Sequence, residues 1–291
     1  MSLKAALESR KFAITAEVGP AKGTAVEDIH EIAGLLAGRV DAVNATDQQS
    51  AVMRLGSMVT CHLVKQKGLD TVLQMTCRDR NRLALQSDLL SAWVLGIQNV
   101  LAITGDLPQL GDHPQAKPVY DIDSVQLLSA IAGLNEGRDM TGHDLEGRPS
   151  FLAGAVVNPG ADTEASFELQ IAKMEKKIKA GARFFQTQAV FEPDKFARFM
   201  KRVEGFGVPV LAGIIPLKSV GMARFMNRNI AGVFVPDPII KKLSDSKDKT
   251  QAGIEIAADL IGQLRGLCQG VHIMAVGSER NVPRILDAAG L

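Results

Sequence analysis

Eight short apolar runs, separated by segments with helical periodicity, constrain the fold of this chain more than any other feature. Most are apolar on both faces, which is the pattern of strands covered on both sides of a parallel sheet. Alternating strands and helices form right-handed crossover units, and eight such units predict closure into a barrel. The predicted strands are Phe12–Val18, Asp41–Ala45, Thr71–Thr76, Val100–Ile103, Phe151–Val157, Phe184–Thr187, Val208–Ile215 and Val271–Val276.

The length of the chain fits one such barrel. The 291 residues, 46% of them hydrophobic, are enough for one large core, and barrels of this kind routinely occupy such a length as one domain. We therefore expect an α/β protein with a (β/α)8 TIM barrel as a single domain over residues 1–291. A doubly wound open sheet is the alternative, although the Gly-x-Gly-x-x-Gly fingerprint of a Rossmann loop is absent after the first predicted strand.

The charge balance and the cysteines limit the kinds of partner. Lys and Arg number 33 and Asp and Glu number 32, so no overall field favours nucleic acid or a charged membrane. Cys61, Cys77 and Cys268 form no Cys-x-x-Cys pair, which suits buried thiols in a reducing compartment better than a metal site. The N-terminus lacks the apolar core of a signal peptide, and no apolar run reaches the length of a membrane span. We expect a cytoplasmic protein with no membrane span and no metal.

A long loop follows the fourth predicted strand and carries a carboxylate near its start. The chain turns at Thr104-Gly105-Asp106 and continues with glycines and prolines to Tyr120. Gly-Asp is also a common turn signal. Because connections beyond about 12–15 residues are uncommon unless they are functional, we favour a site here over a plain turn.

Polar side chains follow most of the predicted strands, where the chemistry of a barrel enzyme is found. They include two carboxylates, several amides and one arginine, and His113 is the only histidine that we place nearby. No Ser-His pair or metal cluster is evident, so a bound cofactor suits this set better than nucleophilic or metal-dependent hydrolysis. A lone carboxylate in an apolar barrel can have its pKa raised by burial and act as an acid. The residues at these strand ends are Glu17, Asn44, Gln74, Thr104–Asp106, Asn158, Gln186, Gln188, Pro216 and Gly277–Arg280.

Structural roles compete with these functional ones. A carboxylate such as Glu17 often pairs with a lysine, and an amide such as Gln188 often caps the next helix. Arg78, Arg80 and Arg82 form a charge run at a helix start and are expected to be solvated. We expect Asp79 to cap the helix that runs to Leu95.

Several motifs, in their order and spacing, resemble the 5,10-methylenetetrahydrofolate reductase family over nearly the whole chain. The resemblance is greatest to the subgroup of acetogenic and related bacteria and to reductase domains fused to homocysteine methyltransferases. The motifs are ITAEVGP with Glu17, CRDRN at Cys77–Asn81, LAITGDLP at Leu101–Pro108, VYDIDS at Val119–Ser124, LNEG at Leu134–Gly137, VVNPG at Val156–Gly160, MEKKIKAGARFFQTQ at Met174–Gln188 and GIIPL at Gly213–Leu217.

The resemblance implies a barrel with non-covalent flavin, FAD rather than FMN, that interconverts 5,10-methylenetetrahydrofolate and 5-methyltetrahydrofolate. Glu17 would be the general acid that opens the imidazolidine ring of the folate. Asp106 would lie near flavin and folate, Gln188 would hydrogen-bond the folate, and Arg280 would hold it. The family contacts its flavin at positions matching Asn44, Gln74, Thr104, Gly105, Asp106, Tyr120, Asp121, Asn158 and Lys177.

The chain also departs from the family pattern. Gln74 replaces a histidine common before the Thr-Cys of the third strand, and Thr104 replaces an arginine common before Gly-Asp. Val220 stands where an aromatic residue commonly stacks on nicotinamide, so we expect electrons from a partner subunit or an iron-sulfur protein. An oligomer is expected. A pterin-dependent methyltransferase, an aldolase and a subunit whose main role is binding remain alternatives.

Overall fold

The computed structural model describes residues 2–291 and contains a closed barrel of eight parallel strands. Each strand pairs with the next in sequence, and β8 pairs with β1. This architecture confirms the predicted single-domain TIM barrel. The strands are β1 (Ala13–Val18), β2 (Ala42–Ala45), β3 (Thr71–Thr76), β4 (Asn99–Ile103), β5 (Leu152–Val157), β6 (Phe184–Ala189), β7 (Val210–Ile214) and β8 (Gly270–Ile273).

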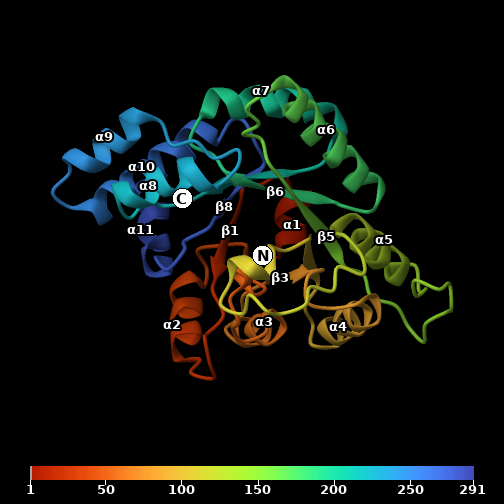
Figure 1. Cartoon of the computed structure of the whole chain (residues 1–291). Coiled ribbons are helices and arrows are strands. Elements are labelled where there is room, and N and C mark those ends of the chain that lie inside the picture. The colour runs from red at the N-terminus through yellow and green to blue at the C-terminus, as the bar shows by residue number, and fades with distance from the viewer. Residues whose placement is uncertain (1) are drawn as a thin grey trace.

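The helices surround the strands, as Figure 1 shows, apart from the short α1 (Leu3–Glu8). Helix α4 (Arg82–Val94) shows how local sequence sets a boundary: the Asn81 side chain accepts a hydrogen bond from the amide of Ala84. The prediction that Asp79 caps this helix was wrong, because Asp79 pairs with Arg78. The others are α2 (Glu27–Leu36), α3 (Ser57–Lys65), α5 (Ser124–Asn135), α6 (Glu164–Lys179), α7 (Pro193–Val203), α8 (Val220–Asn229), α9 (Asp237–Asp245), α10 (Lys249–Leu264) and α11 (Val282–Ala288).

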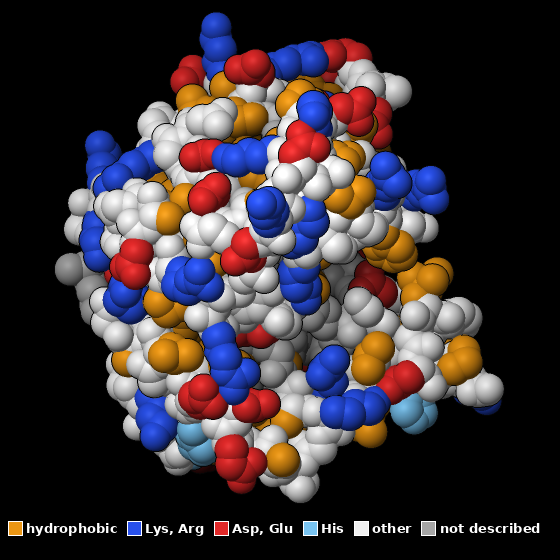
Figure 2. All heavy atoms as spheres, turned by 90° about the vertical axis from the view of Figure 1, so that its left-hand side faces the viewer, with side chains coloured by type: hydrophobic (Ala, Val, Ile, Leu, Met, Phe, Trp, Pro, Cys, Tyr) orange, Lys and Arg blue, Asp and Glu red, His pale blue; other side chains and the backbone are white. Residues whose placement is uncertain are grey.

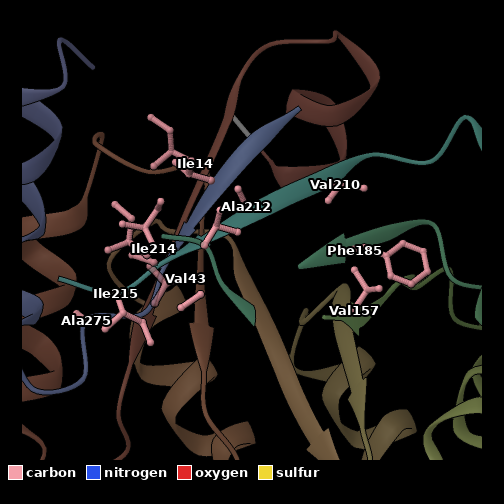
Figure 3. Close-up of a cluster of buried hydrophobic side chains, with 14 of the residues drawn as sticks. Ile14, Val43, Val157, Phe185, Val210, Ala212, Ile214, Ile215 and Ala275 are labelled. Carbon is pink, nitrogen blue, oxygen red and sulfur yellow. The ribbon is translucent and has the colours of Figure 1, made fainter. Parts of the chain in front are cut away.

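Successive side chains of each strand point alternately out of and into the barrel, and this divides the core into two parts. The larger part lies between the barrel and the helices and contains outward-facing strand residues, several of which are drawn in Figure 3. The smaller part fills the amino-terminal end of the barrel. It joins Ala13, Val72, Leu101, Phe184 and Leu211 to residues of α1. Gly154 makes room for the Phe184 ring, because a Cβ at this position would lie 2.2 Å from Cζ of that ring.

The eighth strand is shorter than predicted. It ends at Ile273 rather than Val276, because Val276 and Gly277 have φ angles of 47° and 77° and cannot continue a parallel ladder. The carbonyl of Val276 instead accepts a hydrogen bond from the ammonium of Lys218. In residues 2–291, no helix is both long enough and apolar enough to cross a bilayer.

Candidate functional site

A layer of polar side chains lies inside the barrel, above the apolar layer at its amino-terminal end. Asn44 and Gln186 exchange two amide hydrogen bonds of 2.8 and 3.2 Å. The Gln186 amide also donates to Oγ1 of Thr15, which lies 2.9 Å from Nδ1 of His272. All four side chains are buried, so this network fixes their orientations in a part of the barrel that excludes water.

Glu17 lies on top of this network. Its Oε1 accepts a 2.8 Å hydrogen bond from Nε2 of Gln74 and lies 3.3 Å from Nε2 of His272. Glu17 is 8% exposed and His272 is 2% exposed. Thr15, His272 and Glu17 thus form a continuous line of groups that can hold and pass a proton, and it ends at a carboxyl group.

A cavity of about 360 Å³ lies at the carboxyl ends of the strands, with Glu17 in its wall. Its volume is within the range of small-molecule sites, and an apolar surface with a few convergent polar groups is typical of such sites. Leu101, Ile103, Val156, Val157 and Met274 supply the apolar lining. The polar lining comes from Glu17, Gln74, Asn158, Gln170, Lys173, Lys177, Gln186, Thr187, Gln188 and His272.

A bulge in β6 brings Thr187 and Gln188 to this cavity. The register between β6 and β7 shifts after Gln186, which pairs with Leu211, so that Ala189 pairs with Gly213. Within the bulge, Oγ1 of Thr187 accepts a 2.9 Å hydrogen bond from the amide of Gly213. The Thr187 hydroxyl therefore takes the place of a backbone acceptor in the ladder.

Lys177 of α6 reaches the rim of the cavity and donates a 2.7 Å hydrogen bond to the carbonyl of Val156. Desolvation, with a smaller contribution from the charge of Lys173, lowers the pKa of Lys177 to about 8. A half-buried ammonium of this kind suits an anionic ligand, since a nearby negative charge would favour its protonated form.

The cavity brings together Glu17, Gln74, Asn158, Lys177 and Gln188 among the predicted site residues. Asn44 lies beneath it and touches Gln186.

The predicted site residues of the β4–α5 loop do not line this cavity. Thr104 and Asp106 are exposed, and neither contributes to the cavity lining. The hydroxyl of Tyr120 donates to the carbonyls of Gly105 and Asp106, so it fastens the start of the loop. Asp121 pairs with Arg82 at the start of α4, and this ion pair lowers the pKa of Asp121 to about 2.

Arg280 lies in the turn after β8 and points to α2. Its guanidinium lies 2.9 Å from Asp28 and 2.8 Å from Glu31. Arg280 is absent from the lining of the cavity that holds Glu17.

A second cavity, of about 400 Å³, lies beside the β4–α5 loop and includes Arg78, Arg80 and His113. Arg78 is only 2% exposed, pairs with Asp79 and donates to the carbonyls of Gln48 and Asp106. The expectation that this charge run is solvated was therefore wrong for Arg78, although Arg82 is exposed.

Sequence reasoning missed His272 and Thr15. The signal was present as spacing: Thr15 lies two residues before Glu17, and His272 lies two residues before Met274, so each pair shares the inner face of its strand. His113, the histidine that we expected near the site, is exposed and bonded to Asp112.

The donor set of the cavity around Glu17 fits a flavin. Gln74, Asn158 and Gln188 offer amide donors and acceptors for the carbonyl and N–H edge of a neutral heterocycle, and Lys177 offers a cation for a phosphate. Among residues 2–291, no group of three or more His, Cys, Asp or Glu side chains could hold a metal ion.

The family model and the relatives found by sequence agree on one family. A family model described as "Methylenetetrahydrofolate reductase" matches residues 2–290. "Methylenetetrahydrofolate reductase 2" of Schizosaccharomyces pombe is 28% identical over 240 residues, covering 75% of this chain and 35% of that protein. "5,10-methylenetetrahydrofolate reductase" of Pectobacterium carotovorum is 26% identical over 203 residues, covering 68% of this chain and 61% of that protein. The chain thus spans about a third of the length of the eukaryotic relatives and less than two thirds of the bacterial one.

The solved structures support the fold. An uncharacterized protein from Clostridium thermocellum that binds two copies of 5-methyl-5,6,7,8-tetrahydrofolic acid superposes with a TM-score of 0.63 at 16% identity. The match covers 99% of this chain and 98% of that one. At this identity the likeness shows the shared barrel alone.

Proposed function

Because the chain belongs to the methylenetetrahydrofolate reductase family, we propose that it is a flavin-dependent enzyme that interconverts 5,10-methylenetetrahydrofolate and 5-methyltetrahydrofolate. The observation that carries the proposal is the position of Glu17. It is a buried carboxyl group at the wall of a cavity, with His272 and Gln74 on the same oxygen atom. This arrangement can deliver a proton to a bound heterocycle, which ring opening of methylenetetrahydrofolate requires.

In this proposal the proton comes from the carboxyl group of Glu17 and goes to a ring nitrogen of the imidazolidine. Gln74 and His272 both approach Oε1, so we assign the transferred proton to Oε2. His272 and Thr15 hold the orientation of Glu17, and His272 is close enough to exchange a proton with it. Leu101, Ile103 and Val156 supply an apolar surface beside the transfer.

The cofactor is proposed to be FAD. Gln74 and Asn158 would hold the ring, and Lys177 would neutralise the pyrophosphate. Asn44 lies beneath the cavity and would affect the cofactor indirectly, through its hydrogen bond to Gln186. When bound, the flavin supplies the hydride that converts the methylene carbon into a methyl group.

The remaining site residues already have partners in the structure. Gln188 would hydrogen-bond the folate through its side-chain NH2 group, because its Oε1 accepts from the amide of Ala189. Arg280 would hold the folate only after a substrate carboxylate replaces Asp28 and Glu31 as its partner.

On the β4–α5 loop, Asp106 would tune the flavin if the loop turns the exposed side chain inward. Thr104, Gly105, Tyr120 and Asp121 would contact the cofactor through the same loop.

The electron donor is proposed to be a partner subunit or an iron-sulfur protein, as in the acetogen-type subgroup. Val220 supports this, because an aliphatic side chain at the start of α8 offers no ring to stack on nicotinamide. A reducing compartment such as the cytoplasm suits the three buried free thiols.

The purified protein provides the test. We expect a yellow flavin band in its absorbance spectrum, FAD in the supernatant after heat denaturation, and reduction of methylenetetrahydrofolate with a viologen donor at a higher rate than with NADH. A colourless protein that gains no flavin on reconstitution would overturn the proposal. A flavoprotein that transfers methyl groups without redox change would instead favour a methyltransferase.

A further inference from the structure

Arg78 is the only buried Lys or Arg side chain in residues 2–291. The others are at least partly exposed, and Figure 2 shows basic and acidic side chains interspersed over the side of the molecule that carries α2 and α9. Burying a guanidinium is costly, and apolar residues in place of a buried ion pair often give a protein that is equally stable or more stable. Stability alone therefore does not explain an arginine at this position.

The guanidinium of Arg78 makes four hydrogen bonds. Nε and Nη2 donate to the two carboxylate oxygens of Asp79 at 2.8 and 2.7 Å, and this contact raises the pKa of Arg78, so the group stays charged. Nη1 donates to the carbonyl of Asp106 at 3.3 Å, and Nη2 donates to that of Gln48 at 3.3 Å. Asp79 thus fixes the plane of the guanidinium, and the other two bonds hold the β4–α5 and β2–α3 loops.

Both ends of the long β4–α5 loop meet at Arg78. At its start, Gly105 packs on the arginine side chain, since a Cβ on Gly105 would lie 3.1 Å from Cβ of Arg78. At its end, the carbonyl of Arg78 accepts a 2.7 Å hydrogen bond from the amide of Val119. The hydroxyl of Tyr120 then reaches back to the carbonyls of Gly105 and Asp106. The position of the whole loop relative to the barrel is therefore set at this base.

These contacts leave two backbone donors of the Gly105-Asp106 turn free. Arg78 and Tyr120 take up the two carbonyls of the turn. The N–H of a trans peptide points away from its carbonyl, so the amides of Asp106 and Leu107 point away from both side chains. Neither amide donates a hydrogen bond to an acceptor in residues 2–291.

The turn lies next to the cavity around Glu17. It follows β4 directly, and Ile103 at the end of that strand is part of the cavity lining. Gln74 of the neighbouring strand β3 also lines the cavity, four residues before Arg78. Arg78 itself is not part of this lining, so its effect on a ligand there must pass through the turn.

We propose that Arg78 is a positioning residue of the flavin site, whose guanidinium holds the Asp106 peptide so that the free amides of the turn can hydrogen-bond the bound flavin. The inference rests on the proposed function, because it needs a flavin in the cavity around Glu17. Reduction increases the negative charge of the flavin, and hydrogen bonds to charged groups are roughly twice as strong as those to neutral ones. Donors held in this way therefore favour the reduced flavin.

The test is the affinity for FAD and the midpoint potential of the bound flavin in Arg78→Met, which keeps an unbranched side chain and removes every donor. We expect oxidised FAD to bind about tenfold more weakly and reduced FAD about 100-fold more weakly. This additional factor of about ten lowers the two-electron potential by about 30 mV. Arg202→Met removes an exposed arginine that pairs with Glu168 and should match wild type in both measurements. Wild-type affinity and potential in Arg78→Met would overturn the inference.

Arg78→Lys keeps the buried charge but replaces the planar guanidinium by an ammonium group, which cannot hold Asp79 and both loop carbonyls at once. Its affinity and potential should lie between those of wild type and Arg78→Met, and it provides the measurement if Arg78→Met does not fold. Wild-type values in Arg78→Lys would show that a cation suffices and that the planar contact with Asp106 has no role.

Hydrogen exchange of the apoprotein tests the hold on the loop without any cofactor. In Arg78→Met, the hydrogen-bonded amides of Gly111 and Val119 should exchange about tenfold faster, whereas those of α6 and α7 should not change. Unchanged exchange in the loop would contradict the inference. A wild-type protein that binds no flavin would contradict the proposed function itself, whereas a flavin-binding wild type matched by Arg78→Met would contradict only the role of Arg78.

Discussion

His272 Nε2 lies 3.3 Å from Oε1 of Glu17, inside the barrel and almost out of contact with solvent. The two residues come from neighbouring strands, β8 and β1, whose parallel register pairs Thr15 with His272. Glu17, two residues beyond Thr15, therefore lies one side-chain layer above the imidazole. The contact follows from the register of the barrel, and it gives the proposed acid a neighbour that can exchange protons with it.

Replacing His272 by alanine should slow the folate half-reaction by about 10²-fold, the scale of one positioned proton-transfer group. Flavin content should stay the same, because the flavin is proposed to be held by Gln74, Asn158 and Lys177 and not by His272. Stopped-flow reoxidation of the reduced enzyme by methylenetetrahydrofolate measures the effect. His113→Ala, which changes an exposed histidine beside Asp112, is the control and should match wild type. Equal rates in the two variants would remove His272 from the proton route.

Affinity for FAD should fall as pH rises through the pKa of Lys177, which desolvation lowers to about 8. Below that pH the ammonium is charged and attracts the pyrophosphate, and above it the attraction is lost. In Lys177→Met, binding should be about tenfold weaker at neutral pH, and the step near pH 8 should vanish. Fluorescence titration of the apoprotein measures both. Lys176→Met changes an exposed neighbour on α6 and should keep the step in FAD affinity near pH 8. If Lys176→Met also loses this step, a group other than Lys177 is responsible for it.

Thr187→Val should raise KM for the folate more than it lowers kcat. The hydroxyl of Thr187 accepts from the amide of Gly213 and shapes the bulge that brings Gln188 to the cavity. Valine keeps the volume and removes that acceptor, which costs about 1–3 kcal/mol for a buried amide. Thr187→Ser keeps the hydroxyl and should restore most of the KM. Steady-state kinetics measures KM and kcat of both variants. Identical values for Thr187→Val and Thr187→Ser would show that the hydroxyl has no positioning role.

Gly154→Ala should destabilise the protein by about 1–3 kcal/mol, because the new Cβ would overlap the ring of Phe184 inside the barrel. Gly34→Ala on α2 has open space around the same added atom and should stabilise the helix by up to about 1 kcal/mol. Urea unfolding gives both free energies. Equal stability of the two variants would show that Phe184 can repack.

The sequence predicted the barrel because each strand and helix has its own local pattern. Glu17, Gln74, Asn158 and Gln188 were identified as strand-end residues, and closure of the barrel brings them to one cavity. No local pattern indicated the role of His272, since a histidine within an apolar run looks like any other core residue until the register pairs it with β1.

The β4–α5 loop was the hardest part to predict. Its length suggested a site, but its course depends on contacts with distant segments. Asp112 pairs with Lys22 and accepts from the amide of Met53, and Gly111 lies so close to Ala51 that a Cβ would be 1.8 Å from its carbonyl oxygen. The exposure of Arg78 was mispredicted for the same reason. The loop covers this side chain, and the carbonyl of Asp106 accepts a hydrogen bond from it. Such contacts belong to the assembled barrel and leave no periodic signal in the chain.

The role of Glu17 is tested most directly by single-turnover kinetics of Glu17→Gln. The amide keeps the size of the side chain and removes the transferable proton. After chemical reduction of the flavin, methylenetetrahydrofolate should reoxidise wild type rapidly and should leave Glu17→Gln reduced, although the variant binds flavin and is reduced as wild type is. Reoxidation of Glu17→Gln at the wild-type rate would contradict the assignment of Glu17 as the acid.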